Sequence, residues 1–281
     1  MSPSANERQE TDAQIQAATG VLLEARDRYA ALRGFIDPMT GSMLAAENEA
    51  TPFDPIAMQI TRHRARATDA VELLFESMYD EGEATIHARP FAMYALIRMS
   101  IEASALANWT LQSEKKGDRI FRSLQVAYTH LREYALFAST IAAEEKARPY
   151  TDFRDDKSKR LIELKDAVGV LRQKELTTLP KYTNILQAVS PTVPPKIPQN
   201  IDSPFVVWKM ASAFLHGSDH IVTDLGDVRL VSEDESGQTV EITPSLQLLA
   251  SCALICVQQI ERLDDRQRYL ATTAYGGRKL L

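Results

Sequence analysis

Cysteine is nearly absent from this sequence, which limits both disulfides and metal sites. The two that occur, Cys252 and Cys256, are four residues apart, so a helix would place both on one apolar face. A disulfide across one helical turn is geometrically awkward, and a metal site would need more thiols or histidines. We therefore expect two reduced, buried cysteines, which suits a cytoplasmic protein.

Glycine is also scarce, with 11 in 281 residues, and the glycine-rich loops that cradle phosphates are missing. The motifs GxGxxG, HExxH, GxSxG and paired CxxC do not occur either. These absences argue against a nucleotide-binding α/β fold and against the common hydrolase and zinc-protease signatures. We expect no cofactor and no metal site.

The sequence has no excess of positive charge and no uniformly apolar run of membrane-spanning length. Its formal net charge of −6 gives no general attraction to nucleic acid or to anionic membranes. The amino terminus carries no hydrophobic signal region. Residues 246–257 are apolar but shorter than the roughly 20 residues of a spanning helix, and residues 91–111 contain charges. We expect a soluble cytoplasmic protein that does not enter a membrane.

What the chain does contain is hydrophobic periodicity of the helical kind. Apolar residues recur every three or four positions in segments broken by glycine, proline and charged clusters. This pattern predicts an all-α fold, a bundle of about seven helices, with a small β-hairpin inserted near residues 227–243. We expect one helical domain over residues 11–275, after a disordered segment at 1–10 and before a loose tail at 276–281.

Proline marks two further features. Pro149 is expected to end the long helix that begins near Asp118. Five prolines between Ser190 and Pro204 exclude a regular helix there, so residues 190–204 are expected to form an extended surface loop.

The segment from Phe91 to Leu111 is the most informative stretch, because an otherwise apolar helix carries two opposite charges. Arg98 and Glu102 are four residues apart and so lie on one helix face. Buried charge is costly unless it is paired. One interpretation is a structural ion pair that fixes how neighbouring helices pack. The other is a site in which Arg98 binds a phosphate or carboxylate and Glu102 orients it.

A second polar group follows one side of a later helix at steps of four: Trp208, Ser212, His216 and His220. Histidine can exchange a proton near neutral pH, so His216 is a candidate catalytic acid or base. A hydrogen bond from His216 to Glu102 or to a backbone carbonyl is an alternative, and metal binding by the two histidines is another. Gly217 indicates that the helix ends at this point.

Three short motifs stand out: Ala95–Leu96–Ile97–Arg98 with Glu102 and Trp109, the helix entry Asp118, Arg119 and Arg122, and the late series Trp208, Ser212, His216 and Gly217. In these motifs the sequence resembles a group of uncharacterised, actinobacterial helical proteins that are similar to HEPN-like proteins. The resemblance covers about residues 55–270. Many HEPN-like proteins are dimeric toxin or defence ribonucleases, so the resemblance implies RNA or another phosphate-containing ligand as a partner, and a homodimer.

The resemblance is incomplete at the catalytic motif. HEPN ribonucleases carry an arginine a short distance before a histidine; here Arg122 is too far from His130, and Lys209 precedes His216. Two hypotheses remain. In the first, Arg98, Glu102 and His216 are catalytic residues, with Arg119, Arg122, Ser212 and Trp208 binding the ligand. In the second, the same cluster is a buried ion-pair network in a non-catalytic structural or partner-binding protein.

Overall fold

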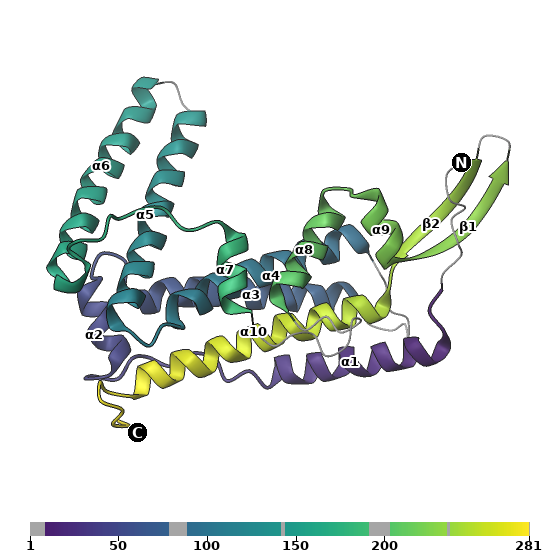
Figure 1. Ribbon diagram of the computed structural model, residues 1–281, viewed down its shortest axis with the longest axis horizontal. Helices are drawn as coiled ribbons and strands as arrows, with labels where there is room; N and C mark the ends of the chain where they lie inside the picture. The colour runs from purple at the N-terminus through teal and green to yellow at the C-terminus, as the bar shows by residue number, and fades with distance from the viewer. Residues whose placement is uncertain (1–8, 79–88, 142–143, 191–202, 235–236, 281) are drawn as a thin grey trace. The chain divides into compact units, whose positions relative to one another are not determined.

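The computed structural model describes residues 9–78, 89–141, 144–190, 203–234 and 237–280. Within these ranges the chain forms ten α-helices, one short 3₁₀-helix and one two-stranded antiparallel sheet (Figure 1). The mainly helical class and the hairpin are confirmed, whereas the expected number of about seven helices is wrong. Among the described residues, no helix is long and apolar enough to cross a membrane.

The chain divides into two compact units. The first comprises the described parts of Met1–Arg33, Arg64–Ala105 and Leu186–Leu263, and the second comprises those of Gly34–His63, Leu106–Ile185 and Asp264–Leu281. Four helices begin in one unit and end in the other, namely α3 (Ile56–Met78), α4 (Pro90–Leu111), α7 (Tyr182–Val189) and α10 (Leu246–Thr272). The single domain expected over 11–275 stays a prediction.

The first unit also contains α1 (Asp12–Ala30), α8 (Pro204–Leu215), α9 (Asp219–Leu225), β1 (Gly226–Asp234) and β2 (Gly237–Pro244). Thr11 caps α1, because its hydroxyl accepts a hydrogen bond from the Gln14 backbone and the Gln14 side chain bonds back. Glu10 stabilises the start of α10 from another segment of the chain, its carboxylate accepting from the backbone N–H groups of Leu246 and Gln247 at 2.9 Å each. The segment predicted to be disordered covers residues 1–10. Its last residue, Glu10, is held by these hydrogen bonds, and residues 1–8 lie outside the described residues.

The core of the first unit is apolar and combines helices distant in sequence. Ile97 of α4 and Cys256 of α10 are fully buried, and the Cys256 thiol lies 3.8 Å from the Ile97 carbonyl oxygen. Cys252 is buried and free as well, so the prediction of two reduced core cysteines is confirmed. Burial raises the pKa of the Cys256 thiol to about 12, so it stays protonated and unreactive.

The second unit also contains α2 (Met43–Ala50), α5 (Lys116–Ile141), α6 (Glu144–Ala167) and a 3₁₀-helix η1 (Gly169–Leu171). Helix α2 lies within residues 38–54, for which the sequence predicts a connector with at most one short helical turn. Ser42 starts the helix, since its hydroxyl accepts a hydrogen bond from the Ala45 backbone at 3.1 Å. Helices α5 and α6 run side by side as a helical hairpin (Figure 1). Leu131, Ala135 and Leu161 are buried in this pair.

Two sequence expectations about proline have different outcomes. Pro149 does not end a helix, because it lies inside α6, where it costs the backbone hydrogen bond to residue 145. Among the described residues, α5 ends at Ile141 and α6 begins at Glu144. The proline-rich loop expected at 190–204 lies mostly outside the described residues.

The hairpin and the tail are both defined by backbone pairing. Strands β1 and β2 pair from Gly226 opposite Pro244, with a bulge between Leu230 and Ser232. Near the carboxyl terminus, Thr273 bridges to Lys279 across a turn with two positive-φ glycines. The described part of the predicted loose tail therefore carries backbone hydrogen bonds.

Candidate functional site

The predicted ion pair of α4 is present and is joined by a tryptophan from α8. Glu102 Oε1 accepts a hydrogen bond from Arg98 Nε at 2.8 Å and another from Trp208 Nε1 at 2.7 Å. The Arg98 guanidinium carbon also lies 5.6 Å from the centre of the Trp208 ring, within range of a cation–π contact. The side chains of Arg98 and Glu102 are 28% and 26% exposed, so the pair is only partly buried.

Helices α4 and α8 are held together by a second contact between aromatic rings. Tyr94 and Phe214 stack with their centroids 3.9 Å apart, and both are essentially buried. The Arg98–Glu102–Trp208 cluster therefore lies beside a packed helix pair. The residue of α8 that bonds to Glu102 is therefore Trp208, whereas the sequence suggested His216 as one alternative.

His216 lies at the carboxyl-terminal cap of α8, with its side chain exposed. Gly217 has a φ of 62°, and the backbone N–H groups of Gly217 and Ser218 bond to the carbonyls of Phe214 and Ala213. This is a Schellman motif, so the helix ends where the glycine indicated. Among the described residues, no hydrogen bond or ion pair connects the His216 side chain with Arg98 or Glu102.

The other members of the predicted α8 series do not converge on the ion pair. The Ser212 hydroxyl donates to the Trp208 carbonyl at 2.7 Å, within its own helix. His220 is exposed in α9. In the part of the chain that the structure describes, no three His, Cys, Asp or Glu side chains are grouped closely enough to hold a metal ion.

Arg119, predicted to bind a ligand, is fully buried in the second unit. Its Nε donates to both oxygens of Glu47 at 3.0 and 3.1 Å, and one terminal nitrogen pairs with Glu47 as well. Both side chains are 0% exposed. The hydrogen bonds and negative charge of Glu47 outweigh the effect of burial and raise the pKa of Arg119. This guanidinium is therefore fully used inside the protein.

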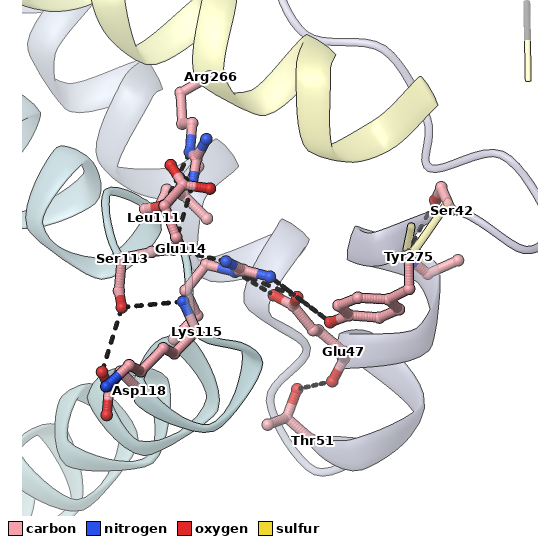
Figure 2. A network of polar contacts seen from close by, with 12 residues as sticks. Ser42, Glu47, Thr51, Leu111, Ser113, Glu114, Lys115, Asp118, Arg266 and Tyr275 are labelled. Carbon is pink, nitrogen blue, oxygen red and sulfur yellow. Dashed lines mark hydrogen bonds and ion pairs between the residues drawn. The ribbon is translucent and has the colours of Figure 1, made fainter. Parts of the chain in front are cut away.

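Tyr275, from the carboxyl-terminal segment, joins this buried ion pair, although Tyr275 itself is 44% exposed. Its hydroxyl donates to Glu47, and Figure 2 shows the ring pointing at that carboxylate. Burial, the hydrogen bond and the charge of Glu47 raise the pKa of Tyr275 above its usual range. We name Glu47, Arg119 and Tyr275 the buried triad, after the two residues of the ion pair, which are the two that are fully buried. No sequence spacing predicted this triad, because Glu47 lies 72 residues before Arg119 and Tyr275 lies 156 residues after it.

Arg122, the other predicted ligand-binding arginine, is also bonded internally. Its guanidinium donates to the Trp109 carbonyl and lies 4.8 Å from the Trp109 ring centre. Burial lowers the pKa of Arg122, and the charge of Asp118 opposes that shift. The resemblance motif that links Trp109 to Arg122 thus corresponds to a contact between α4 and α5.

The turn between α4 and α5 is tied by further polar contacts (Figure 2). Arg266 donates to the carbonyls of Leu111 and Ser113 at 3.0 and 3.1 Å. The Ser113 hydroxyl donates to Asp118, which also accepts from Lys174. Burial would raise the pKa of Asp118, but the bonds from Lys174 and Ser113 lower it below its usual value. All of these contacts hold the turn in place.

Sequence reasoning missed an exposed apolar surface on the α5–α6 hairpin. Tyr134, Phe137 and Ile141 follow one side of α5 at steps of three and four, and Tyr150 and Phe153 lie on α6. Phe137 is 62% and Ile141 68% exposed. Tyr134 and Tyr150 meet edge to face at 5.4 Å, so the two stripes adjoin. We name these five residues the aromatic face.

Comparisons with protein-family models, with curated proteins and with solved structures gave no match.

Proposed function

We propose that this chain is a non-catalytic helical protein that acts through association, and that the aromatic face is its association surface. The main support for this proposal is that five large side chains are exposed in one continuous stripe across two packed helices. Isolated exposed apolar residues are ordinary, whereas contiguous ones mark sites of interaction.

The size of the aromatic face supports this proposal. Side chains of this kind bury roughly 150–250 Å² each, so five of them at about half exposure offer roughly 500 Å². That area is at the upper end of the patches that monomers expose. With its polar rim it approaches the roughly 800 Å² per partner of a standard interface.

The charges beside the aromatic face favour a second copy of the chain as the partner. Asp156 and Arg160 are exposed, four residues apart, and share the side of α6 that carries Phe153. Each forms an exposed ion pair within the helix, Asp156 with Lys157 at 3.5 Å and Arg160 with Glu163 at 2.8 Å, and exposed pairs of this kind contribute little free energy. Under a two-fold axis each copy offers the same surface, so Asp156 of one copy can face Arg160 of the other twice. A surface of one sign would instead select an oppositely charged partner. The homodimer expected from the resemblance thus gains a candidate interface.

The catalytic hypothesis receives less support from the geometry. Arg98 and Glu102 bond to Trp208, and His216 is exposed without a described bond to either. We therefore propose the ion-pair network as a structural element. The HEPN-like relationship, the ribonuclease activity and the cytoplasmic location stay predictions.

The proposal is tested by the mass of the protein in solution, measured by light scattering after size-exclusion chromatography. The wild type is expected at twice the chain mass of 31.4 kDa, and Phe137→Glu at the mass of a monomer, because a buried unpaired charge is costly at an interface. Leu136→Glu is the matched control, since Leu136 is the neighbouring residue, 68% exposed, but not part of the aromatic face.

A charge exchange tests the two-fold arrangement. Arg160→Glu is expected to weaken the dimer, and the double variant Asp156→Arg with Arg160→Glu is expected to restore it. A wild type that stays monomeric at about 100 µM, far above micromolar dissociation constants, would contradict the proposal. So would a Phe137→Glu variant that remains dimeric.

A further inference from the structure

A cleft of about 620 Å³ lies in the second unit between α5, α6 and residues 178–182. This volume is within the range of small-molecule sites, which is roughly 300–1,000 Å³. The cleft contains none of the residues of the Arg98–Glu102–Trp208 cluster, the buried triad or the aromatic face.

One wall of the cleft is an extended segment fixed to α5 by side-chain hydrogen bonds. The Gln125 amide nitrogen donates to the Thr177 hydroxyl at 3.1 Å and to the Thr178 carbonyl at 3.3 Å. The Leu179 backbone N–H donates to the Thr129 hydroxyl at 2.9 Å. Since Gln125 and Thr129 are themselves buried, this wall is anchored in the core. The cleft is therefore formed without a ligand.

The cleft carries positive charge in an acidic protein. Arg132 of α5, Arg154 of α6 and Lys181 of the wall line it, against the single carboxylate of Glu133. Three cations and one anion give +2, whereas the whole chain has a net charge of −6. The three cations come from three different segments, so they surround the cleft and can contact one anionic group from several sides.

Arg154 already pairs with a neighbouring carboxylate, but its guanidinium can still donate hydrogen bonds to a ligand. Its Nε and one terminal nitrogen bond to Asp155 at 2.8 and 2.7 Å. Both side chains are substantially exposed, and exposed pairs of this kind contribute little free energy. A guanidinium has five N–H donors, so Arg154 can also donate to a ligand.

We propose that the cleft binds a small phosphorylated molecule with an apolar or aromatic body, of the nucleoside phosphate class. The cations and the hydroxyl of Thr151 provide donors for the several oxygens of a phosphoryl group. Leu106, Leu136 and Leu179 provide an apolar wall for the rest of the ligand. A carboxylate, with two oxygens, would leave part of this donor set unused. The proposal is independent of the aromatic face.

Isothermal titration calorimetry with ATP, adenosine and inorganic pyrophosphate tests this site in the full chain. ATP is expected to bind, and adenosine, which lacks phosphate, is expected to bind at least about tenfold more weakly. Lys181→Gln and Arg132→Gln are each expected to weaken ATP binding about tenfold. Both side chains are exposed, so the variants should fold, which thermal unfolding verifies.

Lys159→Gln is the matched control, because Lys159 is an exposed cation of α6 outside the cleft. Its affinity for ATP is expected to equal that of the wild type. The proposal is overturned if neither ATP nor pyrophosphate binds, or if the Lys181 and Arg132 variants bind ATP as the wild type does. A single-stranded RNA decamer that binds where ATP does not would also overturn it and would indicate a nucleic-acid surface instead.

Discussion

The indole N–H of Trp208 donates to Glu102 Oε1 at 2.7 Å, the same oxygen that accepts from Arg98. One carboxylate oxygen thus joins a local ion pair within α4 to a residue 106 positions later in the chain. Because hydrogen bonds to charged groups are stronger than neutral ones, this contact fixes how α8 lies on α4.

We predict that Trp208→Phe lowers the free energy of unfolding by about 1.5–3 kcal/mol, since it removes a charge-assisted hydrogen bond and part of the indole packing. Chemical denaturation measures this change. Val206→Ala, at an exposed position of the same helix, is the control and should change stability by less than about 0.5 kcal/mol. If both variants unfold alike, the contact does not stabilise the helix pair.

The buried triad predicts a larger effect at Glu47. Glu47→Ala leaves the Arg119 guanidinium buried without its carboxylate, which costs about 3–5 kcal/mol. Glu49→Ala is the matched control, because Glu49 is exposed on the same helix, and it should cost less than about 0.5 kcal/mol. Equal denaturation midpoints for the two variants would show that the ion pair is not buried in solution.

Tyr275 predicts a stability change at alkaline pH. Its pKa is raised in the folded protein by burial and by Glu47, so its contribution is fully present below the unfolded pKa of about 10 and is lost as the pH rises above that value. The Tyr275→Phe variant has no hydroxyl at this position that could ionise. The stability difference between wild type and Tyr275→Phe should therefore shrink between pH 9 and about pH 11. A difference that stays constant in denaturation experiments at these pH values would contradict the hydrogen bond to Glu47.

How much could be read from the sequence depends on how local each contact is. The spacing of Arg98 and Glu102 correctly indicated an ion pair, and Gly217 correctly indicated the end of α8, since both are decided within one or two helical turns. The residue of α8 that meets the ion pair could not be predicted, because helical periodicity does not give the rotation of α8, which presents Trp208 rather than His216.

The remaining features depend on contacts between segments distant in the chain. In the sequence, Glu47 is one of several acidic residues in a segment interpreted as a connector, and no local feature distinguishes it from Glu49. The cleft is built by α5, α6 and the segment up to Tyr182, whose cations look like ordinary surface residues in the sequence. Tyr134 and Phe137 have the spacing of core residues, and only the structure shows that no described segment covers them. Periodicity therefore predicted the helices better than the surfaces they form.

His216 gives the sharpest test between the two functional hypotheses. Because its side chain is exposed at a helix cap, His216→Ala should change the free energy of unfolding by less than about 0.5 kcal/mol. If the protein is non-catalytic, wild type and His216→Ala leave a labelled RNA equally intact over hours of incubation. His220→Ala, at another exposed histidine of the same region, is the matched control. A wild type that cleaves the RNA, together with a folded His216→Ala variant that does not and a His220→Ala variant that does, would reject the non-catalytic proposal. That result would assign His216 the role of an acid or base, since imidazole is the group there that can exchange a proton near neutral pH.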